Sequence, residues 1–178
     1  MATQILRVLK KVPNYIKAKS EITFHWWIFG IAKNWTILNR ISPKLRPALW
    51  KLTGCKIGEN VAIGYDVYYD VGNASLIHIE DEVWIASRSL ILCHKRDLSK
   101  YYKNERYNDL SYQKHPVIFK KGCVVGMGCI VMPGVTIGEG AIIGAGSLVV
   151  SDIPAWTIAV GNPAKVVKQI QERVTEEK

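Results

Sequence analysis

The sequence lacks any apolar run of the roughly 18 to 20 residues that a membrane-spanning helix needs. Its start, MATQILRVLKKVPNYIK, is broken by charges and has neither the apolar region nor the cleavage site of a secretory signal. The four cysteines form no CxxC pair and no cluster with histidine, so the usual spacing of a zinc site is missing as well. We therefore expect a cytoplasmic, mainly single-domain protein with free, packed thiols.

Acidic residues are almost absent from the first third of the chain. Residues 1–56 contain eleven Lys or Arg and one acid, Glu21, whereas residues 57–178 contain thirteen Lys or Arg and fourteen acids. The formal net charge of +9 therefore belongs to the N-terminal third, which also holds four of the six tryptophans. This segment is predicted to be a separate helical, basic and aromatic piece.

In most of the chain after residue 56, apolar residues recur every six positions. This period matches neither the two-residue repeat of a strand nor the 3.6-residue repeat of a helix. The rows from residue 119 are FKKGCV, VGMGCI, VMPGVT, IGEGAI, IGAGSL and VVSDIP, and residues 57–68 and 79–90 follow the same rule. Such a repeat predicts a solenoid in which three hexads form a coil of eighteen residues. Positions one and five are expected to face inward, and glycine at position two to supply backbone conformations closed to other residues.

The six-residue period breaks twice. Sixteen residues separate Ile63 from Ile79, and twenty-eight separate Ile91 from Phe119, so neither interval is a multiple of six. The first break predicts an irregular rung, and the second predicts an excursion over about 94–118. Insertions in a solenoid project from one face and often form binding loops.

The run PGVTIGEGAIIGAGSLVVSDIPAW, followed by GNPAK, resembles the hexapeptide-repeat acetyltransferases, especially the galactoside, maltose and surface-polysaccharide O-acetyltransferases. The resemblance covers residues 57 to about 170. It implies a mainly β protein built as a left-handed parallel β-helix, acetyl-CoA as co-substrate, no metal, and a homotrimer with active sites at subunit interfaces. We expect a helical cap over 1–56, the β-helix over 57–160, and a closing segment with a short C-terminal helix over 161–178.

The resemblance also assigns a catalytic residue. His94, in ILCHKRD, stands where the excursion leaves the repeat, which is where the similar enzymes carry their catalytic histidine. A histidine titrates near neutrality and can take the proton of an attacking hydroxyl, so direct transfer needs no separate nucleophile. His115, at the far edge of the excursion, is the rival base. Cys93 is interpreted as a packing residue, because neighbours on a strand point to opposite faces.

In the similar enzymes coenzyme A lies along the outside of the coils. Matching positions imply that its pantetheine arm meets backbone groups, and that lysines of the GNPAKVVK tail meet its phosphates. The alternative is that these are ordinary solvated helix lysines. Ser151 departs from the pattern, since Lys or Arg is common there. The implied cofactor-binding residues are Gly126, Met127, Ala145, Gly146, Asn162, Lys165 and Lys168.

The acceptor site is predicted from Asp70, Trp84, Tyr101 and Arg106. Asp70 stands where the galactoside enzymes carry a sugar-binding asparagine, and a carboxylate there either accepts from sugar hydroxyls or orients His94. Trp84 suits stacking on a sugar or packing at a subunit contact. The tyrosines and Arg106 of the excursion suit a sugar pocket or the next subunit equally.

The same residues also fit other functions. The same fold and cofactor would serve N-acetylation of an amino sugar nucleotide or O-acetylation of an antibiotic, and a zinc enzyme of this fold would need histidines closer together than these. The basic, Trp-rich segment fits a cap over the first coil or a peripheral membrane contact at the inner face, and the second alternative function is a non-enzymatic nucleic-acid- or membrane-binding module. No nucleic-acid-binding module is recognisable, so no nucleic-acid partner is expected. The acceptor is expected to be a saccharide, free or lipid-linked.

Overall fold

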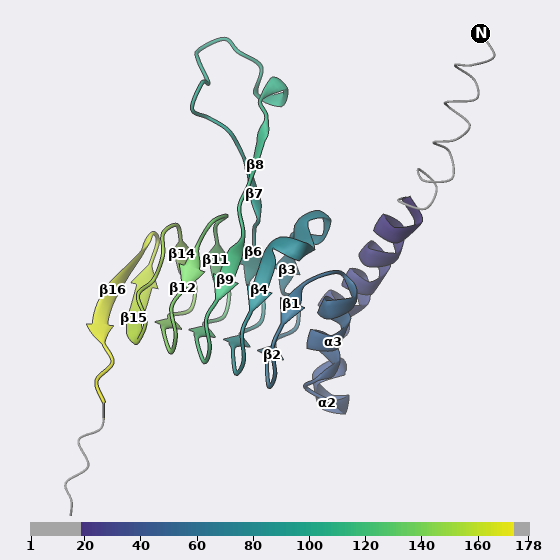
Figure 1. Ribbon diagram of the computed structural model, residues 1–178, viewed down its shortest axis with the longest axis vertical. Coiled ribbons are helices and arrows are strands. Elements are labelled where there is room, and N and C mark those ends of the chain that lie inside the picture. Colours follow the sequence, from purple (N-terminus) through teal and green to yellow (C-terminus); the bar gives the residue numbers. More distant parts are fainter. Residues whose placement is uncertain (1–18, 173–178) are drawn as a thin grey trace, which may run out of the picture.

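The computed structural model describes residues 19–172. Its centre is a parallel β-helix of triangular cross-section, with helices at one end and a projecting ribbon on one edge (Figure 1). Sheet A comprises β1 (Lys56–Ile57), β4 (Ile77–Ile79), β9 (Val117–Phe119) and β12 (Thr136–Ile137). Sheet B comprises β2 (Ala62–Ile63), β5 (Trp84–Ile85), β10 (Val124–Val125), β13 (Ile142–Ile143), β15 (Thr157–Gly161) and β16 (Ala164–Gln169). Sheet C comprises β3 (Tyr68–Tyr69), β6 (Leu90–Ile91), β11 (Ile130–Val131) and β14 (Leu148–Val149).

The chain visits sheets A, B and C in turn, so each coil has an A–B corner, a B–C corner and a C–A corner. Phe119 pairs with Ile137, and Val125 pairs with Ile143, in parallel register. These partners are eighteen residues apart, which confirms the predicted coil of three hexads. Both predicted breaks fall at the C–A corner, which is the only corner interrupted within the described coils.

The inward positions of the hexads are also confirmed. The aliphatic residues at position one form a buried row on each sheet, and the small residues at position five fill the interior at the corners. Two of the latter are Cys123 and Cys129, whose side chains are fully buried. The core is therefore a stack of identical layers, in which each coil covers its neighbour.

Glycine does recur at position two, but the reason predicted for it, a backbone conformation closed to other residues, is wrong. The left-handed φ values fall at position four, where Gly140 has φ +61° and Arg88 has φ +62°. Position-two glycines are needed because the next coil lies too close. A Cβ on Gly138 would come within 2.7 Å of the Ala155 Cα, and one on Gly58 within 2.8 Å of the Asp81 nitrogen.

The last predicted hexad, VVSDIP, also has a different register. Ile153 was expected at position five, but it bridges to Ile137 on sheet A and so occupies position one. The C–A corner between Val149 and Ile153 is shortened, and Asp152 closes it by accepting a 2.7 Å hydrogen bond from the Thr136 backbone N–H. A buried side chain on sheet A determines the register here more strongly than the count of six.

The end of the chain differs from the sequence prediction as well. A helix was expected within 161–178, but β16 is a strand that pairs antiparallel with β15 as far as its described end. The turn between them contains the cis Asn162–Pro163 peptide. The free edge of β15 offers backbone partners that a helix could not use, and Val166 and Val167 favour a strand. Residues 173–178 lie outside the described part.

At the opposite end, the chain is helical over 19–34, and α2 (Leu38–Ile41) and α3 (Leu45–Leu52) follow. Phe29 and Trp50 belong to the same core as the coils, and their rings pack against Tyr69 at centroid distances of 5.0 and 4.1 Å. The fully buried Arg46 donates to the backbone oxygens of Ala32, Trp35 and Ile63, which ties the helices to the first coil. In the described part, 19–172, no helix has the length and apolar character for a membrane crossing.

Candidate active site at the interrupted corner

The two breaks in the repeat lie one above the other. The irregular rung is a 3₁₀ segment, η1 (Val71–Leu76), at the C–A corner of the first coil. The excursion begins at the C–A corner of the second coil as β7 (His94–Arg96), which pairs antiparallel with β8 (Tyr112–Lys114). The excursion is therefore a two-stranded ribbon with a loop that contains η2 (Tyr107–Asp109), as Figure 1 shows.

The stacking of these corners brings Asp70 against His94. Tyr69 and Ile91 are register partners on sheet C, and the Asp70 N–H donates to the Ile91 carbonyl at 3.2 Å. Above this anchor the His94 Nδ1 contacts the Asp70 Oδ2. Asn73 completes the cluster, since its amide donates to the Asp70 Oδ2 at 2.9 Å and lies 3.4 Å from the His94 Nδ1.

Burial gives the two members of this pair different environments. The Asp70 side chain is 8% exposed, whereas that of His94 is 38% exposed. A buried carboxylate accepts hydrogen bonds only, so its contact assigns the ring hydrogen to Nδ1 and leaves Nε2 as an acceptor. The arrangement is that of a base whose orientation is set by a carboxylate, with an open side for a substrate.

Two neighbouring residues are less suited than His94 to act as the catalytic nucleophile or base. Cys93 is fully buried, which confirms that it points away from His94, and burial, with the Asp70 charge adding, raises the pKa of its thiol to about 12. It is therefore a poor nucleophile near neutral pH. His115 donates its backbone N–H to the Cys93 carbonyl at 2.9 Å, and within residues 19–172 its ring has no carboxylate partner.

The ribbon forms one wall beside His94. The Tyr112 ring meets the His94 ring edge to face, with centroids 5.2 Å apart. The Arg96 guanidinium lies 3.9 Å above the Tyr112 ring and donates to the Leu110 carbonyl, which holds the loop against the strand. Sequence reasoning missed Arg96 and Asn73. Their signal was weak, because both lie in segments without the repeat and only spatial proximity gives them a role.

The other predicted acceptor residues do not contact this cluster. Tyr101 and Arg106 lie in the outer loop of the excursion, where Tyr101 packs near Tyr107 and Arg106 Nε lies 3.9 Å from the Asp109 Oδ2. Trp84 is 59% exposed on sheet B, the side of the prism opposite the C–A corner. Of the four predicted acceptor residues, only Asp70 meets His94 in one chain.

Four of the predicted cofactor residues gather at the B–C corner of the third and fourth coils. Gly126 and Met127 lie in one coil, and Ala145 and Gly146 lie directly above them in the next. A Cβ on Gly126 would lie 2.5 Å from the Ala145 nitrogen, so the two coils pack closely at that point, whereas a Cβ on Gly146 would meet no atom within 4 Å. The main chain at Gly146 is therefore the part of this corner that is open to the close approach of a ligand.

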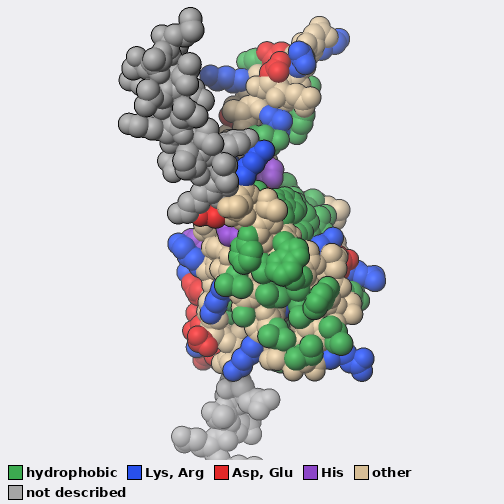
Figure 2. Space-filling view, turned by 90° about the vertical axis from the view of Figure 1, so that its right-hand side faces the viewer, with side chains coloured by type: hydrophobic (Ala, Val, Ile, Leu, Met, Phe, Trp, Pro, Cys, Tyr) green, Lys and Arg blue, Asp and Glu red, His purple; other side chains and the backbone are tan. Residues whose placement is uncertain are grey.

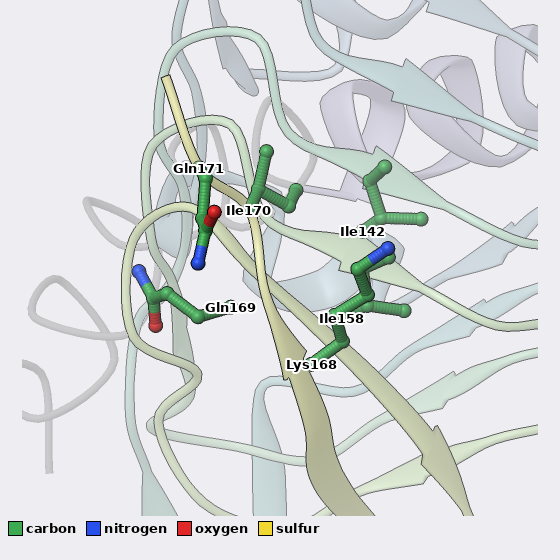
Figure 3. Close-up of a pocket in the computed structure, with 6 residues that line it drawn as sticks. All are labelled: Ile142, Ile158, Lys168, Gln169, Ile170 and Gln171. Atoms are coloured by element: carbon green, nitrogen blue, oxygen red, sulfur yellow. The ribbon is translucent and has the colours of Figure 1, made fainter. Parts of the chain in front are cut away.

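The remaining cofactor candidates belong to the closing hairpin. Asn162 lies in its turn, and Lys165 and Lys168 are exposed on β16. A hollow of about 710 Å³ lies beside this hairpin. In Figure 3, Lys168 lies beside Ile142 and Ile158 in this hollow, and the chain over 169–171 forms its other side. An apolar floor next to a cation suits the nucleotide end of a phosphorylated ligand.

The base and the cofactor residues thus lie at different corners of one prism. His94 leaves the C–A corner, whereas Gly126 and Ala145 lie at the B–C corner, with the full width of sheet C between them. Within the described residues there is also no group of three His, Cys, Asp or Glu side chains placed to hold a metal ion.

Comparisons with known proteins agree with this architecture. Residues 116–151 match the family of bacterial transferase hexapeptides (six repeats). A maltose O-acetyltransferase from Clostridium difficile 630 is 26% identical, with 86% of this chain and 88% of that chain covered and a TM-score of 0.60. AntD, an N-acyltransferase from Bacillus cereus in complex with dTDP and 3-hydroxybutyryl-CoA, is also 26% identical, with coverage of 66% and 67% and a TM-score of 0.52.

A hexapeptide-repeat acetyltransferase from Vibrio cholerae, VCA0836, complexed with acetyl coenzyme A, shares the fold at 18% identity and a TM-score of 0.69, over 88% of this chain and 90% of that chain. A search of curated protein sequences gave no match. The repeat, the three-sided coil and these similarities together show that the chain has the left-handed parallel β-helix fold found in the hexapeptide acyltransferases.

Proposed function

We propose that the chain is an acetyl-CoA-dependent O-acetyltransferase that acts on a hydroxyl of a sugar or of a surface-polysaccharide precursor. The observation that carries the proposal is the His94–Asp70–Asn73 cluster at the one corner where the repeat is interrupted. The 26% identity with a maltose O-acetyltransferase, over most of both chains, supports the same class of reaction. Because acetyl-CoA is a cytoplasmic metabolite, we place the reaction there, on a free or a lipid-linked acceptor.

In the proposed mechanism Asp70 accepts the Nδ1 hydrogen of His94, so that Nε2 faces the acceptor. As the hydroxyl oxygen attacks the thioester carbonyl, Nε2 takes its proton, and the Asp70 carboxylate stabilises the resulting imidazolium. A tetrahedral oxyanion forms, and a backbone N–H is the simplest donor to it. When the intermediate collapses, the carbon–sulfur bond breaks and the imidazolium returns the proton to the coenzyme A sulfur.

The separation of the two corners supports a site between subunits. The base at the C–A corner of one chain and the open backbone around Gly146, at the B–C corner of another, would then face one substrate pair. We propose a homotrimer for this reason, with the excursion reaching toward the neighbour. Trp84 and the outer tyrosines would lie at or near such a contact.

N-acylation of an amino sugar nucleotide is the second candidate function. AntD, similar over two thirds of the chain, is an N-acyltransferase that was solved with dTDP. A base oriented as His94 is would serve an ammonium acceptor as well as a hydroxyl. The two candidates differ in the acceptor alone.

One experiment tests both. Thiol release from acetyl-CoA is measured against a panel of maltose, a galactoside, a lipid-linked sugar and a dTDP-linked amino sugar, with His94→Ala as the control for enzyme-dependent turnover. Turnover with hydroxyl acceptors supports the proposal, and turnover with the amino sugar alone supports the second candidate. Absence of turnover across the panel, together with absence of coenzyme A binding by calorimetry, would overturn both.

A further inference from the structure

The helices at the end of the prism expose an unusual amount of apolar surface. Along the helix 19–34 one side is buried against the coils through Ile28, Phe29 and Ala32, yet the other side is also apolar. Figure 2 views this end and shows hydrophobic side chains gathered over it, with Lys and Arg at the margins. The exposed members, here called the cap surface, are Ile22, Phe24, Trp26, Trp27, Trp35, Ile37, Ile41, Leu45 and Leu52.

These side chains do not belong to the core of the chain. Trp27 is 63% exposed and Ile41 is 67% exposed, although both lie on helices whose opposite sides are fully packed. Isolated exposed apolar residues need no explanation, but a set gathered on a single face usually marks a surface that another molecule covers. The cap surface is therefore expected to have a partner.

The charge around the cap surface indicates what that partner offers. Residues 19–56 contain seven Lys or Arg and a single acid, Glu21. Arg40, Lys44 and Lys51 are exposed, and none of them forms an ion pair with a described residue. A second copy of this surface would bring the same cations into contact, which like-charge repulsion disfavours. A partner with negative charge and an apolar interior fits better.

We infer that the cap surface docks on an anionic lipid bilayer. Tryptophan favours the boundary between headgroups and acyl chains, where Trp26, Trp27 and Trp35 would lie. The aliphatic residues would enter the acyl region, and Arg40, Lys44 and Lys51 would meet lipid phosphates. No helix described over 19–172 can cross a bilayer, so the helices would lie in its plane. A nucleic acid would supply the phosphates but no apolar phase for Ile37 and Ile41.

This inference goes beyond the proposed reaction and does not depend on it. The full-length chain is sedimented with vesicles of equal parts phosphatidylglycerol and phosphatidylcholine, and in parallel with phosphatidylcholine alone. Binding to the anionic vesicles that weakens at high salt is expected. Arg40→Gln/Lys44→Gln/Lys51→Gln should lower the partition constant by about fivefold for each charge, roughly 100-fold together.

Matched variants separate the surface from the overall charge. Lys95→Gln/Lys100→Gln/Lys103→Gln removes the same charge from the exposed excursion and should leave binding nearly unchanged. Trp26→Ser/Trp27→Ser should lower the partition constant at unchanged net charge, while thermal unfolding confirms that each variant is folded.

Three results would overturn the inference. The first is the absence of binding to anionic vesicles at low salt, and the second is equal loss from the two triple variants. The third is a large oligomer, seen by light scattering without lipid, that Trp26→Ser/Trp27→Ser dissociates, because it would assign the cap surface to a second copy of the chain.

Discussion

The A–B and C–A corners of the same coils are built in opposite ways. At the A–B corner each turn is short, and the next coil lies so close that Gly58 and Gly138 have no room for a Cβ. At the C–A corner the chain lengthens in two consecutive coils, and a Cβ on Gly72 would meet no atom within 4 Å. The difference shows how a repeat can carry a site, since two corners maintain the stack while the third is free to hold polar groups.

The strongest test of this contrast is removal of the proposed base. His94→Ala should lower kcat by about 10²- to 10⁴-fold, the usual contribution of a general base, while the coils remain folded. Coenzyme A affinity, measured by calorimetry, should change little, because its proposed contacts lie at the B–C corner. His115→Ala is the matched control and should keep most of the activity. If His115→Ala instead loses most of its activity while His94→Ala stays active, the base is His115, at the other edge of the excursion.

Asp70→Asn tests whether the carboxylate orients the base or binds the acceptor. If Asp70 acts on His94, as their contact indicates, kcat should fall by about 10²-fold with little change in the KM of the acceptor, because the ring loses its tautomer control. If Asp70 binds sugar hydroxyls instead, the KM should rise while kcat is kept. Steady-state kinetics over a range of acceptor concentration distinguishes the two roles.

A pair of glycine substitutions compares the corners directly. Gly138→Ala places a methyl group 2.7 Å from the Ala155 Cα, so the coils must separate, and we expect a loss of about 1 to 3 kcal/mol of unfolding free energy. Thermal unfolding should show this as a decrease of about 2 to 4 °C for each kcal/mol. Gly72→Ala should stay within about 0.5 kcal/mol of the parent. Equal losses in the two variants would show that the corners do not differ in packing.

The smallest effect is expected at the polar contacts of the A–B corner. Glu80 accepts a 2.8 Å hydrogen bond from the Lys120 ammonium, and this bond is the main reason that the pKa of Glu80 lies below its ordinary 4.5. A lowered carboxyl pKa contributes stability above pH 4.5 that is lost as the pH falls through the folded-state value. Both side chains are half exposed, so Glu80→Gln should cost at most about 0.5 kcal/mol at pH 7. The difference from the parent should shrink as the pH falls below 4.5 and Glu80 becomes protonated, and a difference that grows there would contradict this sign.

The sequence predicted the regular part of the fold well because a hexad repeats a local physical requirement. Inward aliphatic residues must recur wherever the coil returns to the same side, so their positions could be read without a structure. The reason for the position-two glycines could not, since it depends on the distance to the next coil. The strand β16 was missed because an open sheet edge at β15 decides its conformation, and that edge is a feature of the folded chain.

The candidate site was predictable only in part. His94 stands at a visible change of period, and Asp70 lies near the other change, so each could be named. Their contact depends on Tyr69 and Ile91 being register partners in neighbouring coils, which no local pattern reveals. Trp84 was grouped with them through its chemistry, but it belongs to the opposite side of the prism.

The two ends of the excursion meet where it joins the coils, because the His115 N–H bonds the Cys93 carbonyl and the ribbon pairs from His94 onward. The conformational entropy lost on closing a flexible loop grows only logarithmically with its length, about 0.6 kcal/mol for each doubling. The loop beyond the ribbon can therefore lengthen, shorten or be exchanged at small thermodynamic cost, while His94 keeps its place above Asp70. In this architecture acceptor choice can change by insertion and deletion in one loop, without any substitution in the coils that hold the base.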